Sequence, residues 1–216
     1  RQRQMCIRDS YTGTRADHKR ALCDEDMKKV FTRLPSSSAI PLAVRRAQDM
    51  FVLMFLLRGL PFVDLAYLRK SDLRDNVITY RRRKTGRPLS VTLTPEALEL
   101  LKKYMNRDSH SPYLFSLLKS GEGTKEAYRE YQLALRSFNQ QLTLLGEVLG
   151  LNDRLSSYTA RHTWATTAYY CEIHPGIISE AMGHSSIKVT ETYLKPFRNK
   201  KIDEANATVF SPFRKT

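Results

Sequence analysis

The chain has 216 residues, and its 36 Lys and Arg residues outnumber its 22 Asp and Glu residues to give a net charge of +14. This length and a hydrophobic fraction of 41% suffice for one domain with a full core. The positive charge favours a polyanionic partner, DNA above all, although a ribosomal or another RNA-binding protein would carry a similar charge.

Neither a membrane span nor a secretion signal is predicted. The longest apolar run, from Met50 to Leu57, is much shorter than the roughly 20 residues that cross a bilayer, and the chain opens on arginines rather than on an apolar core. The three cysteines, Cys6, Cys23 and Cys171, lack the spacing of a zinc site or a disulfide framework. We therefore expect reduced thiols in a cytoplasmic protein.

The predicted domain begins near residue 21. Residues 1–20 have neither helical nor strand periodicity and are predicted to be a linker or a disordered remnant. Residues 21–216 are predicted to form a single domain with a C-terminal tail from about residue 196. An acidic turn over residues 24–26 indicates the start of a first helix, whose apolar positions continue to Leu34 before Pro35 stops it.

A second helix is predicted from Pro41 to Leu57, with apolar residues on nearly every face, as in the most buried helix of a core. The sequence Arg58-Gly59-Leu60-Pro61 then breaks it. Arg58 is therefore expected at the C-terminal edge of a buried helix, with its guanidinium reaching a cleft. A short helix from Phe62 to Leu68 follows.

A β-hairpin is predicted next, because β-branched residues concentrate in Val77–Arg83 and Leu89–Leu93 and the glycine-containing turn that joins them carries Lys84 at its tip. The remaining predicted elements are helical: Pro95–Tyr104 capped by Thr94, Thr124–Leu149, Ser157–Tyr170, short helices punctuated by Pro175 and Gly183, Ile187–Leu194, and Ile202–Val209. The predicted fold class is mainly α with one small antiparallel β-sheet (α+β).

Arginine, histidine and tyrosine occur together near the C-terminus. An Arg161-His162 pair precedes His184, and Tyr193 lies nine positions after His184. A tyrosine can attack a DNA phosphate where positive charge and hydrogen-bond donors receive the developing negative charge. This combination in a basic chain points to DNA strand exchange.

The segments around Arg58, Lys84, Arg161, His184 and Tyr193 together resemble the catalytic domain of tyrosine recombinases, the phage-integrase family, over roughly residues 20–205. The segments 159–166 and 183–186 are the most recognisable pieces. The resemblance implies the mainly helical catalytic-domain fold of that family. It also implies cleavage and rejoining of duplex DNA through a 3′-phosphotyrosine link, without a metal, a nucleotide or any other cofactor.

In this resemblance, Arg58 and Arg161 bind the non-bridging phosphate oxygens, and Tyr193 is the nucleophile. His184 donates a hydrogen bond to phosphate, and Lys84 protonates the departing 5′-oxygen. Each residue also has a structural alternative: a capping or surface arginine, a satisfied histidine, a packed aromatic, or a lysine in a solvated turn that follows DNA phosphates. His162 is expected to be structural and to face a different side from Arg161.

Tyr158 stands where the family pattern has histidine or lysine. A phenol is a poor general base near neutral pH but can donate a hydrogen bond, so Tyr158 is expected to contact phosphate, with local packing as the alternative. Arg83 and Arg87 are expected to contact phosphate from the hairpin turn, which is also rich in other arginines. The acidic residues near these segments are isolated in the sequence and predict no metal site: Asp64, Asp72, Glu180 and Glu191.

The favoured function is that of a mobile-element (phage or transposon) integrase. The alternatives are a Xer-like resolvase of chromosome dimers and a non-catalytic DNA-binding module derived from such an enzyme. The expected partners are double-stranded DNA and further copies of the chain in a synaptic tetramer, with the C-terminal helix docked on a neighbour, at the nucleoid. The N-terminal DNA-clamping domain of the family has no room before Leu22 and is expected to be absent.

Overall fold

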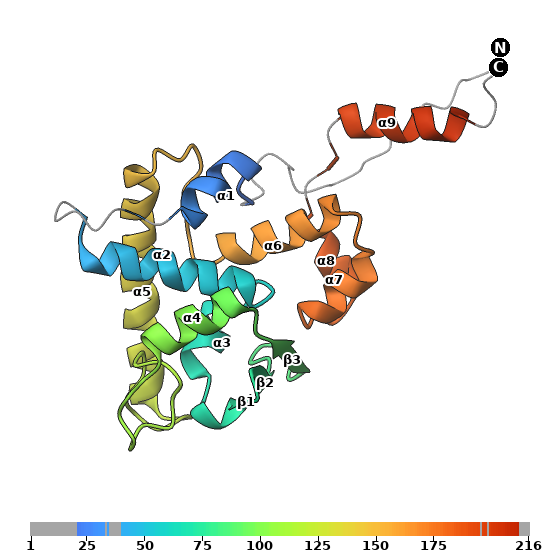
Figure 1. The fold of residues 1–216 in the computed structure, drawn as a ribbon. Coiled ribbons are helices and arrows are strands. Elements are labelled where there is room, and N and C mark those ends of the chain that lie inside the picture. Colours follow the sequence, from blue (N-terminus) through green and yellow to red (C-terminus); the bar gives the residue numbers. More distant parts are fainter. Residues whose placement is uncertain (1–20, 33, 35–39, 195, 198, 212–216) are drawn as a thin grey trace, which may run out of the picture.

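The computed structural model describes residues 21–32, 34, 40–194, 196–197 and 199–211 (Figure 1). In chain order the elements are α1 Asp24–Phe31, α2 Leu42–Leu56, α3 Phe62–Tyr67, a 3-10 turn Lys70–Asp72, β1 Leu73–Arg74, β2 Val77–Arg81, β3 Pro88–Thr92, α4 Pro95–Tyr104, α5 Lys125–Val148, α6 Thr159–Tyr170, α7 Pro175–Ala181, α8 Ile187–Glu191 and α9 Asn199–Phe210. The predicted mainly helical fold with one small antiparallel sheet is confirmed. The predicted linker over residues 1–20 lies outside the described residues.

Helix α2 is the centre of the fold, as its apolar sequence predicts. It packs against α1, α4, α5 and α6, and Figure 1 shows it crossing the middle of the molecule with α5 behind it. Phe51, Leu53 and Met54 are fully buried in the main hydrophobic core. Gln48 is a buried polar residue of this helix, and its amide donates 2.8 Å hydrogen bonds to the Val30 and Thr32 carbonyls at the end of α1.

The helix boundaries follow local signals in most places. The hydroxyl of Thr94 accepts from the Ala97 amide at the start of α4, and the hydroxyl of Thr124 accepts from the Ala127 amide at the start of α5, which satisfies backbone donors that a first turn leaves free. The first helix ends at Phe31 rather than near Leu34. Thr32 already has extended backbone geometry, with ψ at 121°.

The sheet has three antiparallel strands in the order β1–β2–β3, one more than the sequence predicted. The extra strand β1 joins β2 through Asp75-Asn76, both at positive φ (47° and 61°), as in the two-residue turns that match the twist of a hairpin. Strand β2 ends two residues before its predicted end, whereas β3 begins one residue before its predicted start, so the turn extends from Arg82 to Arg87.

A second, smaller hydrophobic cluster lies under α6, α7 and α8. Its buried members are Ala165, Ala168, Ile178, Met182 and Leu194, and Tyr193 packs against them. The predicted helix Ile187–Leu194 ends at Glu191, so Tyr193 lies in the turn that follows α8 rather than on the helix. Helix α9 begins three residues before its predicted start and extends away from the other helices (Figure 1).

The sequence predicts neither a membrane span nor a disulfide framework. No helix in the described part of the chain is both long and apolar enough to cross a membrane. Cys23 and Cys171 are free thiols, whereas Cys6 lies outside the described residues.

Candidate active site

Arg161 is the buried centre of the candidate site. It lies in the first turn of α6 and is only 2% exposed. Its Nη1 donates to the Gly59 carbonyl at 2.9 Å and its Nη2 to the Met182 carbonyl at 2.7 Å, so it joins the end of α2 to the end of α7. Burial, together with the charge of Arg82, lowers the pKa of Arg161 to about 10, which leaves the guanidinium charged at neutral pH.

The chain approaches Arg161 closely just after α2, where Arg58 and Gly59 have positive φ values of 58° and 67°. A Cβ atom on Gly59 would lie 2.8 Å from the Arg161 Cα, so this position has no space for a side chain. A left-handed conformation is costly for arginine and is commonly found at functional sites. Arg58 is half-buried, and its Nη1 donates to the Ser90 carbonyl of β3 at 3.2 Å.

His184 is buried between two polar partners. Its Nε2 lies 2.8 Å from the Arg161 Nη2, and its Nδ1 lies 2.8 Å from the Thr190 hydroxyl. Because a guanidinium can only donate, this geometry fits a neutral imidazole in which Nε2 accepts from Arg161 and Nδ1–H donates to Thr190. Burial and then the positive charges of Arg161, Arg82 and Lys84 lower the pKa of His184 to about 3.

This low pKa predicts a pH-dependent loss of stability. The unfolded chain binds a proton at His184 below about pH 6.5, whereas the folded protein binds one only near pH 3. Stabilisation from neutral His184 is therefore complete above pH 6.5 and falls as the pH is lowered toward 3. We expect the free energy of unfolding of the wild type to fall by up to about 4 kcal/mol more than that of His184→Gln over this range. Urea unfolding of both proteins at pH 7, 5 and 4 tests this, and parallel curves would contradict it.

Tyr193 lies against the residues with which it was predicted to act. Its ring centroid is 4.9 Å from that of His184, with 26° between the planes, and the Arg161 Cζ is 5.8 Å from the ring. The Thr166 hydroxyl donates to the Tyr193 carbonyl at 3.1 Å and ties the turn after α8 to α6. His162 corrects one expectation: its ring is 4.5 Å from that of Tyr193, so it faces the same site and packs on the proposed nucleophile.

The hairpin turn contributes Lys84, which is exposed. Lys84 is close enough to His184 to lower its pKa, which places the turn beside the buried pair of Arg161 and His184. Neighbouring Arg82 differs from the solvated arginine that the basic turn predicted. It is 6% exposed, and its Nε lies 2.7 Å from a carboxylate oxygen of Asp64. Burial raises the pKa of Asp64, although Arg82 opposes this effect.

The residues that the sequence predicts to contact phosphate lie around this centre. Arg83 forms a 2.5 Å ion pair with Glu122 and stacks over Tyr67, with its Cζ 3.7 Å from the ring centroid. Arg87 donates to the His184 carbonyl. Tyr158 is exposed at the start of α6, and its ring centroid is 6.0 Å from that of His162.

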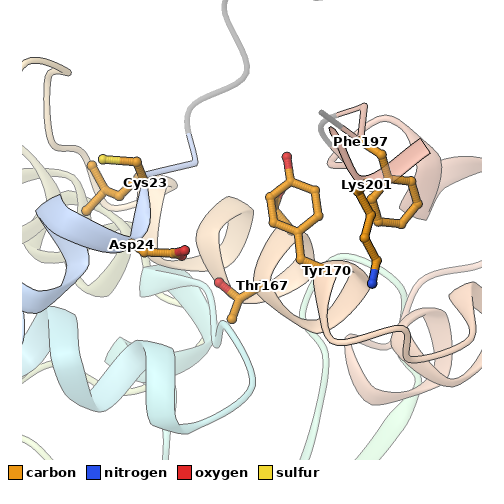
Figure 2. Close-up of a pocket in the computed structure, with 8 residues that line it drawn as sticks. Cys23, Asp24, Thr167, Tyr170, Phe197 and Lys201 are labelled. Carbon is orange, nitrogen blue, oxygen red and sulfur yellow. The ribbon is translucent and has the colours of Figure 1, made fainter. Parts of the chain in front are cut away.

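A cavity of about 350 Å³ is lined in part by α6, and Arg161 is not among its lining residues (Figure 2). In Figure 2 Cys23 and Asp24 are on one side, Tyr170, Phe197 and Lys201 on the other, and Thr167 between them. Its wall includes Thr166, whose hydroxyl contacts the Tyr193 carbonyl. The cavity therefore adjoins the backbone of the proposed nucleophile without being part of the catalytic group.

Comparison with known proteins decides the family. The model of the phage integrase family matches residues 22–200. The chain belongs to this family. Tyrosine recombinase XerA of Pyrococcus furiosus is 25% identical over 180 residues, which cover 82% of this chain and 57% of XerA. Tyrosine recombinase XerC of Haemophilus ducreyi is 29% identical over 134 residues, or 60% of this chain and 42% of XerC. The chain thus spans about half of the length of these relatives.

Solved structures show the same fold. A crystal structure of XerA recombinase matches with a TM-score of 0.58 and 20% identity, covering 91% of this chain and 66% of that protein. The Tn1549 transposon integrase (residues 82–397) in complex with a circular intermediate DNA matches with a TM-score of 0.60 and 17% identity, covering 89% of this chain and 65% of that solved chain. The predicted catalytic-domain fold of the family is confirmed.

In this phage integrase family member, the structure brings Arg161, His184 and Tyr193 into direct contact. Three further contributors escaped the sequence analysis: the Asp64–Arg82 pair, the Thr190 hydroxyl on His184 and the His162 ring on Tyr193. The sequence contained a usable signal for the pairing of Asp64, because a carboxylate within the apolar helix α3 needs a buried partner. Thr190 and His162 had none, because their contacts depend on how α6 and α8 meet.

Proposed function

We propose that this chain is the catalytic part of a site-specific recombinase that cleaves and rejoins duplex DNA through a 3′-phosphotyrosine link. The observation that carries the proposal is the contact of Tyr193 with both Arg161 and His184 in a member of the phage integrase family. One cluster therefore contains the attacking side chain Tyr193, the phosphate-binding cation Arg161 and His184, which orients that cation. The proposed place of action is the cytoplasm, at the nucleoid.

In the proposed reaction, the Tyr193 oxygen attacks the scissile phosphorus. The bond from phosphorus to the 5′-oxygen breaks, and Lys84 gives that oxygen a proton. Arg58 and Arg161 bind the non-bridging oxygens, on which negative charge grows. The new phosphotyrosine bond conserves the energy of the broken bond, so a 5′-hydroxyl of a second DNA end can reverse the step without ATP.

Arg161 has a limited number of donors for this task. Its contacts with Gly59, Met182 and His184 use three of the five N–H groups of a guanidinium. At most two others are available for a phosphate oxygen or for Tyr193. The three protein contacts therefore fix the plane of the guanidinium before DNA arrives, which is the preorganisation that electrostatic catalysis requires.

His184 has two possible roles that differ in the position of one proton. In the tautomer that fits the structure, Nε2 accepts from Arg161 and holds it in place. Donation from Nε2 to phosphate needs the other tautomer, which Thr190 also permits because its hydroxyl can donate to Nδ1. We assign the phosphate-donor form to the DNA complex, where the Nη2 N–H that faced Nε2 passes to a phosphate oxygen while the Gly59 and Met182 contacts hold the guanidinium plane.

The outer residues are assigned supporting contacts with DNA. Tyr158 is exposed beside His162 and is assigned a hydrogen bond to phosphate in place of the histidine or lysine of the family pattern. Arg83 reaches phosphate after leaving Glu122, whereas Arg87 already supports the His184 loop and adds positive charge there. The net charge of +14 favours the double-stranded DNA partner through release of counterions.

Within this class we propose a mobile-element integrase, because the sequence segments resemble that group. The rival within the class is a resolvase of chromosome dimers, in keeping with the Xer names of the curated relatives. Intermolecular joining of an element end to unrelated DNA by the complete protein would support the integrase. Exchange restricted to two identical chromosomal sites would support the resolvase.

The test of the proposed reaction is covalent trapping. A duplex library with a random segment is selected for binding, and recovered sequences are rebuilt with a nick beside each candidate cleavage point. The protein is incubated with these duplexes in the presence of EDTA. A denaturant-resistant protein–DNA adduct supports the proposal, whereas its absence on every bound duplex would favour a non-catalytic DNA-binding module.

We also propose that α9 mediates assembly into a synaptic tetramer. Three of its side chains are apolar and mostly exposed: Ile202 is 55%, Val209 66% and Phe210 59% exposed. The base of α9 is fixed on α6 by the packing of Phe197 against Tyr169, with ring centroids 4.5 Å apart. An exposed apolar face on a helix that extends from the body supports docking on a second copy of the chain.

Removal of residues 199–216 is expected to abolish tetramer formation on DNA and to weaken monomer binding less than about threefold. The contacts of Arg161, Tyr193 and the hairpin all lie in residues that remain. Sedimentation velocity on paired sites and titration of a half-site at low protein concentration measure the two properties separately. Equal losses in both would count against an assembly role for α9.

A further inference from the structure

The hairpin turn and the loop before α8 are joined by three hydrogen bonds to consecutive carbonyls. Arg82 Nη1 donates to the Met182 carbonyl at 2.7 Å, and the Thr85 hydroxyl donates to the Gly183 carbonyl at 3.2 Å. Arg87 Nη1 donates to the next carbonyl, that of His184. We call residues 82–87 together with residues 182–184 the latch.

Arg82 is the fixed part of the latch. Its Nε lies 2.7 Å from Asp64 Oδ2, and both side chains are buried, at 6% and 0% exposure. The other oxygen of Asp64 accepts from the Arg83 amide at 2.9 Å, so one carboxylate holds both the side chain and the backbone of the turn. A buried pair of this kind is sensitive to geometry, because a misplaced partner leaves an uncompensated charge.

On the loop side of the latch, Gly183 packs tightly against the hairpin. Gly183 has a φ of 65°, and a Cβ atom there would lie 2.9 Å from the Arg82 Cγ and 3.0 Å from the Leu89 Cδ1. The stem of Arg82 therefore packs directly on the backbone that precedes His184. The turn and the loop fit one another through backbone contact as well as through polar bonds.

The Met182 carbonyl connects the latch to the phosphate-binding arginine. It accepts from Arg82 Nη1 and from Arg161 Nη2, each at 2.7 Å. The same Nη2 of Arg161 contacts the His184 Nε2 at 2.8 Å. A shift of Arg82 would therefore move an acceptor that Arg161 shares, and with it the guanidinium that His184 orients.

We propose that Arg82 is a positioning residue that joins the Lys84 turn to the loop of His184, so that Lys84 and the Arg161–His184 pair are placed as one unit. Lys84 follows Arg82 by two residues in the turn, and His184 follows Met182 by two residues in the loop. The general acid and the phosphate-binding group thus keep their relative position whenever the latch is closed. The catalytic consequence rests on the proposed function, whereas the coupling of turn and loop does not.

The first measurement is amide hydrogen exchange in Arg82→Lys. Lysine keeps the charge beside Asp64 but lacks the forked guanidinium that reaches Asp64 and Met182 together. Exchange is expected to accelerate about tenfold both in residues 84–86 and in residues 183–184, as for loss of one buried hydrogen bond. Arg74→Lys, the same change at an exposed position of β1, is the matched control. Acceleration on only one side of the latch, or on neither, overturns the proposed coupling.

The second measurement uses the leaving group of the DNA cleavage reaction. A 5′-bridging sulfur departs without a proton, so it compensates for a displaced general acid and not for a displaced phosphate clamp. Arg82→Lys is expected to cleave an ordinary nicked duplex at least tenfold more slowly than Arg74→Lys, and to recover part of that loss on the sulfur-containing duplex. Lys84→Ala serves as the reference for full recovery.

The outcomes separate the two proposals. Equal cleavage by Arg82→Lys and Arg74→Lys, or an equal loss on both duplexes, overturns the role of Arg82 in placing Lys84 while the recombinase function stands. If the wild-type protein forms no adduct on either duplex, the proposed function fails, and the hydrogen-exchange result still decides whether the latch couples turn and loop. Thermal unfolding of each variant shows whether the measured protein is folded.

Discussion

Tyr193→Phe is expected to form no covalent adduct with a nicked duplex that the wild-type protein links to itself. The change removes only the phenolic oxygen. The ring contacts with His162 and His184, at 4.5 and 4.9 Å between centroids, remain possible for phenylalanine. The variant should therefore fold and bind DNA with an affinity within about twofold of the wild type, and its adduct yield on a denaturing gel should fall to the background.

Tyr169→Phe is the matched control, because Tyr169 is also half-buried on the second hydrophobic cluster but packs on Phe197 at the base of α9. This variant should give a wild-type yield of adduct. Peptide mapping of the wild-type adduct should place the nucleotide on Tyr193. An adduct that persists in Tyr193→Phe would move the nucleophile elsewhere, with exposed Tyr158 as the first position to examine.

The helical framework was predictable because it depends on local signals. The apolar run of α2, the caps of α4 and α5, and the break at Gly59 each stand in the sequence within a few residues of the structure that they cause. The break matters most for the site. Because α2 ends there, the Gly59 carbonyl is free of the helix and can accept from Arg161, which lies 102 positions later in the chain.

The hairpin shows local signals that were present in the sequence but were not used. The basic turn reads as solvated in the sequence, yet Arg82 is buried because α3 supplies Asp64 from a distance of 18 positions. The alternation of β2 held a usable signal, because Ile78 and Tyr80 are buried and Arg81 is exposed, which makes Arg82 the next inward position. The short strand β1 had one as well, since two residues of the type that tolerates positive φ, Asp75 and Asn76, were present and unused.

The site itself was predictable as a set of residues and not as a geometry. Resemblance to a family gave Arg161, His184 and Tyr193, and the structure adds that these three touch. The predicted orientation of His162 was wrong, because His162 was expected to face a different side of the helix from Arg161. On α6 their backbones differ by about 100°, but both side chains are long enough to reach the turn that carries Tyr193.

Arg161→Lys is expected to reduce the rate of DNA cleavage by about 10² to 10³, although it keeps the positive charge. Lysine is a point charge with a single nitrogen, whereas the guanidinium contacts Gly59, Met182 and His184 through two different nitrogens. Such a variant cannot hold the carbonyls of two separate helix ends and also face the phosphate. Single-turnover cleavage at saturating protein measures the chemical step apart from binding.

The same substitution is expected to lower the free energy of unfolding by about 2–4 kcal/mol, because a buried carbonyl loses its donor at one or both helix ends. Arg136→Lys, on an exposed position of α5, should change neither the rate nor the stability by a measurable amount. The loss of stability can be separated from the loss of rate. If the cleavage rate is measured well below the unfolding temperature, every variant is folded. If the rate loss vanished under these conditions, Arg161 would be a structural residue. A persistent loss would assign Arg161 to binding the phosphate, because only the reaction needs the forked donors of its guanidinium in a fixed plane.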